Sequence, residues 1–266
     1  TTPVDLGSGG GEDTSTGTCY YGTNDAFGGG AIFINASDTL IINGSILANG
    51  KNATFNDDGG GSGGSIWLIA STFAGNGTIN ASGGNGYSPS ATSGAGGGGA
   101  GRIAIYYTTK TFNGIVHAVS GKGPYYGGAG TIFTKQDAQA YGDLLISNEG
   151  NFAGTSGAAN TTIHENITFD SFNISRGASV ILNGSFRINA SFVNISDAWL
   201  TINMSAVLNV SKIEIDNGLI IKYGGLNVSS INATARRSNL SGNFNVSKFT
   251  IMGSVVLSIS GRLNTT

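Results

Sequence analysis

Asparagine is the residue type whose spacing carries the clearest chemistry in this sequence. Of the 27 asparagines, 18 are followed two positions later by Ser or Thr, with no proline between them. Ser and Thr make up 55 of the 266 residues, so chance would place one behind only about 6 asparagines. Because N-x-[S/T] is the acceptor pattern for N-linked glycans, the excess predicts a heavily N-glycosylated protein. The predicted acceptors are Asn35, Asn43, Asn52, Asn76, Asn80, Asn160, Asn166, Asn173, Asn183, Asn189, Asn194, Asn203, Asn209, Asn227, Asn232, Asn239, Asn245 and Asn264.

Residue types that support catalysis are few. His117 and His164 are the only histidines, and neither has a second His or a Cys at metal-ligand spacing. No G-x-S-x-G elbow supports a Ser-His-Asp set. Asp57 and Asp58 lie in a glycine-rich stretch, where a solvated turn is a commoner role than calcium binding. The sequence therefore predicts no catalytic residue, no metal site and no cofactor beyond covalent glycans. A polysaccharide-active β-helix enzyme is the less favoured alternative.

Cysteine usage and glycan acceptors together predict the location of the protein. The single cysteine, Cys19, excludes an intrachain disulfide and leaves open either an inert thiol or an intermolecular bond. Many glycan acceptors without disulfides are typical of a secreted protein on a prokaryotic surface, archaeal or bacterial. We therefore expect an extracellular, cell-surface protein.

The charge pattern excludes several classes of partner. Lys and Arg total 13 against 15 Asp and Glu, and charged residues are only 11% of the chain. No basic field exists to hold a nucleic acid, and no apolar run reaches the ~18 residues of a membrane-spanning helix. We therefore expect neither nucleic-acid binding nor a membrane span.

The elements that must position the asparagines repeat along the chain. Residues 1–140 hold 33 of the 45 glycines and four copies of one unit, which start at Gly30, Gly64, Gly101 and Gly130. Each copy contains two alternating apolar segments, which predicts two short strands. Equivalent positions of the first segment are Ile32, Ile66, Ile103 and Ile132. Equivalent positions of the second are Ile46, Ile79, Val116 and Leu144, with Ala48, Ala81 and Ala118 two residues after the first three. The small residues predict a narrow interior. The glycine stretches are expected to be loops, either flexible or closely packed.

The second half carries a shorter repeat. An Asn between two apolar residues recurs at a mean spacing of 18, at Asn173, Asn194, Asn209, Asn227 and Asn245. Period two turns the apolar residues inward and the Asn outward. Such a column could also be a hydrogen-bonded, unglycosylated Asn ladder. The Ser or Thr that follows every copy favours glycosylation instead. Because rungs are only ~4.8 Å apart, we expect most but not all sites to be modified.

These repeats predict an all-β fold, a parallel β-solenoid (β-helix) with glycine-rich loops, because stacked repeats bury apolar faces that one repeat cannot bury alone. An antiparallel β-sandwich is the alternative. The expected organisation is a glycine-rich N-terminal extension (1–27), glycine-rich solenoid repeats (28–150) and sequon-rich solenoid repeats of about 18 residues (151–266).

Five glycine-containing strings carry a family resemblance: Gly63-Gly-Ser-Ile-Trp-Leu-Ile, Gly75-Asn-Gly-Thr-Ile-Asn-Ala-Ser-Gly-Gly-Asn-Gly, Gly96-Gly-Gly-Gly-Ala-Gly-Arg-Ile-Ala-Ile-Tyr-Tyr, Gly128-Gly-Ala-Gly-Thr-Ile-Phe-Thr and Tyr141-Gly-Asp-Leu. Residues 6–150 thereby resemble the glycine-rich β-solenoid repeat regions of large secreted surface proteins of bacteria and archaea. The resemblance implies a β-rich extracellular architecture and supplies no catalytic residues. Residues 151–266 depart from it and rest on their own repeat.

The functional prediction is a structural subunit of an extracellular surface filament or stalk. Leu263-Asn-Thr opens a further copy of the Asn motif without completing it. We therefore expect self-association head to tail into a homopolymer, by strand donation at the termini. The alternative is a monomeric adhesin or carbohydrate-binding surface module, which would gather aromatic and polar side chains in one groove.

Overall fold

The computed structural model describes residues 2–11, 26–54, 58–88, 95–151, 159–233, 237–251 and 256–265. All regular elements among them are strands, and the registers between paired strands are parallel. The predicted parallel β-solenoid is therefore confirmed, and the antiparallel sandwich is excluded. The described residues form two compact units. The first comprises Thr1–Gln139 with Asn151–Ala159, and the second comprises Ala140–Gly150 with Asn160–Thr266.

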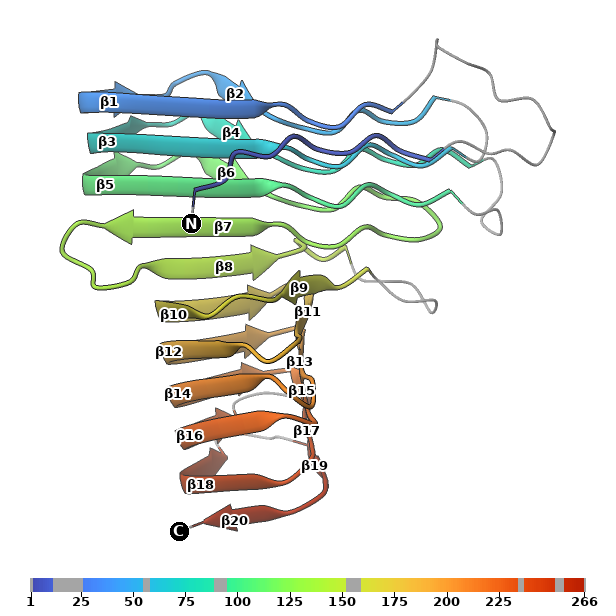
Figure 1. Cartoon of the computed structure of the whole chain (residues 1–266), viewed down its shortest axis with the longest axis vertical. Helices are drawn as coiled ribbons and strands as arrows, with labels where there is room; N and C mark the ends of the chain where they lie inside the picture. The colour runs from blue at the N-terminus through green and yellow to red at the C-terminus, as the bar shows by residue number, and fades with distance from the viewer. Residues whose placement is uncertain are drawn as a thin grey trace. The chain divides into compact units, whose positions relative to one another are not determined.

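In the first unit, long strands alternate with short ones. The long strands stack in one sheet in the order β1 (Ala31–Ile41), β3 (Ser65–Gly75), β5 (Arg102–Phe112) and β7 (Thr131–Gln136), as Figure 1 shows. The short strands β2 (Ser45–Leu47), β4 (Thr78–Asn80) and β6 (Ile115–His117) form another sheet. The registers align Ile32, Ile66, Ile103 and Ile132 in one column. This is the alignment that the four-copy repeat predicts.

The interior of the first unit is thin and apolar. Ile66, Leu68 and Phe73 of β3 are fully buried, and the Phe73 and Phe112 rings stack with centroids 4.6 Å apart. Opposite them lie the small residues of the short-strand layer, and all three are buried: Ala48, Ala81 and Ala118. The predicted narrow interior is therefore confirmed.

The glycine stretches are an ordered bundle of extended segments, which we call the glycine bundle. It comprises residues 7–11, 26–30, 48–53, 59–64, 81–87, 95–101, 118–122 and 125–130. Along one segment the amides donate to three neighbours in turn. The amides of Gly60 and Gly63 donate to the carbonyls of Gly96 and Gly99. Those of Gly61 and Gly64 donate to the carbonyls of Lys51 and Ala48. Those of Gly59 and Ser62 donate to the carbonyls of Gly11 and Ser8. This period of three is that of a polyproline II-type helix, which makes no hydrogen bonds within itself and is held by its neighbours.

Close backbone approach explains why the bundle needs glycine. A Cβ added at Gly121 would lie 1.8 Å from the carbonyl oxygen of Gly84, which leaves no room for any side chain. Of the two possibilities that the sequence leaves for the glycine stretches, close packing is the one observed.

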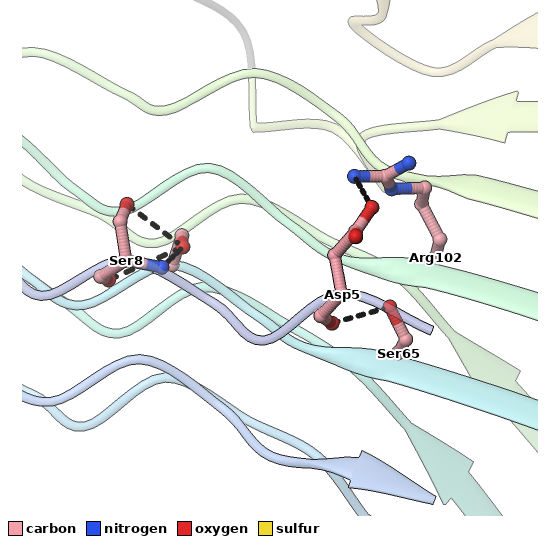
Figure 2. Close-up of polar contacts among 5 residues, drawn as sticks. Asp5, Ser8, Ser65 and Arg102 are labelled. Carbon is pink, nitrogen blue, oxygen red and sulfur yellow. Dashed lines mark hydrogen bonds and ion pairs between the residues drawn. The ribbon is translucent and has the colours of Figure 1, made fainter. Parts of the chain in front are cut away.

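The segment before β1 belongs to this bundle. Gly7 and Gly10 donate to the carbonyls of Gly29 and Ala26. Figure 2 shows the part that lies over the sheet, where the Asp5 carboxylate approaches the Arg102 guanidinium at 3.0 Å. The Ser65 hydroxyl donates to the Asp5 carbonyl at 2.7 Å. The described part of the predicted N-terminal extension, residues 2–11, therefore packs against the first rungs.

The second unit is built from shorter rungs of a long and a short strand (Figure 1). The long strands are β8 (Asp143–Ser147), β10 (Ile167–Ser175), β12 (Arg187–Ser196), β14 (Val207–Asp216), β16 (Gly225–Ala233), β18 (Phe244–Ile251) and β20 (Leu263–Thr265). The short strands are β9 (Thr161–Ile163), β11 (Ser179–Leu182), β13 (Trp199–Ile202), β15 (Leu219–Lys222), β17 (Arg237–Ser241) and β19 (Val256–Ser260). Each set is one sheet of neighbours in that order.

Tight turns join the long strand of a rung to its short strand. Arg176, Asp197 and Asn217 adopt positive φ of 50°, 48° and 55° at equivalent positions of successive rungs. Asn and Asp tolerate this left-handed conformation better than most residues. The turns stack because Ser175, Ser196 and Asp216, which precede them, are in register.

Two predicted alignments in the second half are wrong. Leu144, expected to continue the column of Ile46, Ile79 and Val116, lies in β8 and pairs with Phe172 of β10. The predicted single column of motif asparagines is two columns, because Asn194 pairs with Glu214 and not with Asn209.

Candidate glycosylation surface

The sequon asparagines lie where the strand pattern predicts them, on outward positions. In the five predicted copies the apolar residues on both sides of the Asn are buried, for example Phe172 and Ile174 beside Asn173. Of the 18 sequon asparagines, all but Asn239 have a described side chain, and none of these is buried. The exposed ones are Asn35, Asn43, Asn52, Asn76, Asn160, Asn166, Asn183, Asn227, Asn245 and Asn264. Those of intermediate exposure are Asn80, Asn173, Asn189, Asn194, Asn203, Asn209 and Asn232.

One group of sequon asparagines is held through the side-chain oxygen by a backbone amide. The Oδ1 of Asn52 accepts from the amide of Asn85 at 2.7 Å, and the Oδ1 of Asn166 accepts from the amide of Arg187 at 2.7 Å. Because a backbone N–H can meet only the oxygen end of the side-chain amide, Nδ2 faces the other way. Asn43 and Asn80 are held in the same manner by the amides of Asn76 and Ser82.

Asn160 is held through its oxygen by a hydroxyl. The Ser179 Oγ donates to its Oδ1 at 2.6 Å, and Asn160 itself is exposed. The Nδ2 atom of Asn160, like those of Asn52 and Asn166, donates to no described residue.

A second group donates through Nδ2 instead. Asn209 Nδ2 donates to Asn189 Oδ1 at 2.8 Å, and Asn227 Nδ2 donates to Asn209 Oδ1 at 2.7 Å. Asn189 Nδ2 in turn donates to Thr168 Oγ1 at 3.3 Å. These four side chains form a continuous hydrogen-bonded Asn ladder on adjacent rungs, of the kind that stabilises stacked parallel strands. Two isolated Asn–Asn pairs are bonded in the same way: Asn203 Nδ2 donates to Asn183 Oδ1, and Asn264 Nδ2 donates to Asn245 Oδ1.

The strand registers show which sequons are neighbours. One column contains Asn189, Asn209 and Asn227, and Val228 opposite Val246 continues it to Asn245. The other column contains Asn173, Asn194, Glu214 and Asn232. The predicted alternative of a hydrogen-bonded Asn ladder therefore applies to the first column. The residue in register with Asn209 in that column is Asn189 of the sequon Asn189-Ala-Ser, and not Asn194 as predicted.

A shallow groove runs beside the Asn ladder. Its volume is 460 Å³, and it is lined by Ala190, Asn209, Val210, Ser211, Asn227, Val228, Ser229 and Ser247. A groove of 440 Å³ in the first unit is lined by glycines and by Ser8 and Ser62 of the glycine bundle. Neither groove has an aromatic lining residue, so neither resembles a stacking site for a sugar ring.

The other residues singled out by chemistry lie apart. His117 in β6 is in register with Asn80 of β4. His164 is exposed, 6.5 Å from the Phe186 ring. Asp58 pairs through its backbone with Tyr87. Cys19 and Asp57 lie outside the described residues.

Within the described ranges no three His, Cys, Asp or Glu side chains gather as metal ligands would. The same ranges contain no helix of the length and apolarity that crossing a bilayer requires.

The hydrogen-bond partners that divide the sequon asparagines into two groups were not predicted from the sequence. Asn85 is not in a sequon, yet its amide holds Asn52, and Thr168 ends the Asn ladder. The 33-residue offset between Asn52 and Asn85 was the available signal, since it matches the repeat. No protein-family model, curated protein or solved structure matches this chain.

Proposed function

We propose that this chain is a structural, non-catalytic subunit of an extracellular, heavily N-glycosylated surface filament or stalk that self-assembles head to tail. The observation that supports this most is the open edge of β1. β1 is the last strand of its sheet, so one side of an 11-residue strand pairs with no described strand. An exposed parallel edge of this length is a template for another strand.

Unfinished burial at the same edge supports the proposal. Ile34 and Leu40 are only half-buried, whereas their register partners Leu68 and Phe73 are fully buried. A further rung over β1 would remove the exposed part of these side chains from water, which is favourable by about 25 cal/mol per Å² of apolar surface.

In the part of the second unit that the structure describes, β19 and β20 are the last strands of their sheets. An end rung of one copy that pairs with the edge of the next makes a heterologous contact, which generates an open filament. A strand donated from one copy to its neighbour is the form of this contact that we favour.

Glycans give the filament its surface properties in this proposal. Charged residues are only 11% of the chain, well below the usual share of a soluble surface. Outward glycans would supply the hydration that charge supplies elsewhere, and would shield the strands from proteases. An extracellular, cell-surface location follows from the same chemistry.

Electron microscopy of the glycosylated chain, with light scattering on the same sample, tests the proposal. Filaments with a regular axial repeat are the expected result. Monodisperse single particles at all concentrations would overturn it.

A carbohydrate-binding surface module is a second candidate, and one observation favours it. Phe33 of β1 is 56% exposed, and its ring lies 4.5 Å from that of Trp67, which is the start of an aromatic platform. Aromatic faces of this kind also pack against protein partners. Glycan-array binding that Phe33→Ala abolishes would support this candidate over the filament.

A further inference from the structure

The two kinds of hydrogen bond at the sequon asparagines have different consequences for glycan transfer. An N-linked glycan is attached through Nδ2. In Asn52 and Asn166 a backbone amide holds the oxygen, so Nδ2 points away from that amide and donates to no described residue. In Asn209 and Asn227 the Nδ2 atom is already donated to the preceding rung. A transferase would have to break the Asn ladder to reach it.

The residue that faces each sequon asparagine on the adjacent rung separates the same two groups. The position next to Asn52 is Asn85, and those next to Asn166 and Asn160 are Arg187 and Ser179. None of these three neighbours starts a sequon. A glycan on Asn52, Asn160 or Asn166 therefore does not face a second glycan acceptor at the position that holds its asparagine.

The middle of the Asn ladder differs in this respect. Asn209 has a sequon asparagine on each side, Asn189 and Asn227, each one rung away. Adjacent strands are about 4.8 Å apart, which is less than the width of a sugar ring with its hydration. Exposure agrees, because Asn52, Asn160 and Asn166 are exposed whereas Asn189 and Asn209 are half-buried.

We propose that the folded chain selects among its sequons: Asn52, Asn160 and Asn166 accept glycans, and Asn189 and Asn209 stay unmodified as structural ladder residues. The inference rests on the proposed function only in requiring that the chain is N-glycosylated. In the transfer step, Nδ2 bonds to the anomeric carbon of an oligosaccharide carried as a lipid-linked diphosphate. The bond from that carbon to the phosphate oxygen breaks with its electron pair on the oxygen, and one Nδ2 proton is lost to the transferase.

Transfer to the folded and to the unfolded chain tests the selection directly. The full chain is incubated with a single-subunit oligosaccharyltransferase that accepts N-x-[S/T] and with its lipid-linked oligosaccharide, once natively folded and once in urea that the enzyme tolerates but the chain does not. Mass spectrometry of glycopeptides measures occupancy at each site. We expect occupancy at Asn52 to exceed that at Asn209 by about tenfold in the folded chain, the upper range for loss of one hydrogen bond. In urea the ratio should approach one.

A variant pair keeps the test specific to the Asn ladder. Asn209→Ala removes the acceptor of Asn227 Nδ2 and should raise transfer to Asn227 several-fold. Asn232→Ala lies on the same strand as Asn227 but in the other column, and should leave Asn227 unchanged.

Each outcome has a distinct meaning. Equal occupancy at Asn52 and Asn209 in the folded chain would overturn the selection while leaving a glycosylated filament intact. Modified asparagines elsewhere with Asn52, Asn160 and Asn166 unmodified would overturn it as well. A folded chain that accepts no glycan at any sequon would overturn both the selection and the glycosylated character of the proposed subunit. Loss of filaments with the selection preserved would overturn the proposed function alone.

Discussion

At the scale of single residues, the glycine bundle is the part of the molecule with the least tolerance. Where two of its glycines meet, the segments touch through backbone atoms, so a methyl group there has to displace a carbonyl of another segment. The two glycines to compare are Gly121, where an added Cβ meets Gly84 O at 1.8 Å, and Gly30, where it meets nothing within 4 Å.

Gly121→Ala should lower the free energy of unfolding by about 3 kcal/mol, the upper range for forcing extra atoms into a packed site. Thermal unfolding followed by calorimetry measures the change. Gly30→Ala is the control and should leave the melting temperature within about a degree of the parent, because the added methyl meets open space. Equal effects of the two substitutions would contradict the close packing of the bundle.

The ion pair on the N-terminal segment is the contrasting case at this scale. Asp5 and Arg102 meet at 3.0 Å, but their side chains are 62% and 57% exposed. Exposed pairs of this kind contribute less than about 1 kcal/mol and are screened by salt. Asp5→Asn should therefore leave the melting temperature nearly unchanged at physiological salt. A large destabilisation that persists at high salt would show that the carboxylate has another role.

At the scale of elements, the N-terminal segment depends on glycine at one position of the first rung. A Cβ at Gly28 would lie 1.9 Å from Gly7 O, so a side chain there and the docked segment exclude each other. The equivalent residue of the next rung is Ser62, whose Oγ accepts from the Ser8 amide at 2.6 Å. The N-terminal segment therefore fits between the first and second rungs. Between the second and third rungs, the Ser62 side chain would occupy the space that Gly28 leaves open.

Gly28→Val should release the segment while the rungs stay folded. Hydrogen exchange measures this directly, because the Gly7 and Gly10 amides donate to Gly29 and Ala26 in the docked state. We expect protection at Gly7 and Gly10 to fall to that of an unfolded chain, with protection in β3 and β5 retained. Loss of protection throughout the unit would mean that the segment is required for folding.

The elements also show how far the sequence alone predicts this structure. Ile32, Ile66, Ile103 and Ile132 predicted the register of the long strands, because each rung repeats the same inward positions. The alternation around each motif Asn was equally local. The Asn columns were not predictable from the motif, since Ala190 stands where Val210 and Val228 stand on the next rungs. Because alanine follows Asn189, this copy lacks the large apolar residue that defines the motif. The motif therefore selected Asn194, which lies in the other column.

The glycine bundle and the sorting of the sequons are non-local and therefore escaped prediction. Glycine content indicates that side chains are absent, but many of the hydrogen bonds that order the segments join residues of different rungs, such as Gly60 with Gly96. The same holds for the amide of Asn85 that orients Asn52. Such contacts follow only from the stacking of rungs.

At the scale of the whole molecule, assembly depends on whether the edge of β1 stays compatible with another strand. Natural edge strands avoid pairing by placing a charge where an apolar side chain would point inward. β1 does not do this at Ile32, Ile34 or Leu40, which occupy the inward column with Ile66, Leu68 and Phe73. The charged residue of β1, Asp38, is exposed and lies in the register shift between Ala36 and Thr39, outside the inward column.

Ile34→Lys should therefore abolish filaments and leave the subunit folded. The lysine would occupy the interior of any added rung and would have to be desolvated there, whereas in the free subunit its long stem reaches water past the open edge. Thr39→Lys is the matched control, because Thr39 is exposed on the same strand and belongs to no sequon, so that the substitution adds the same charge without entering the interior. Electron microscopy and sedimentation of the parent and both variants measure the effect. Filaments are expected from the parent and from Thr39→Lys, with single particles from Ile34→Lys. Filaments of unchanged length from Ile34→Lys would show that the contact between copies lies elsewhere than the β1 edge.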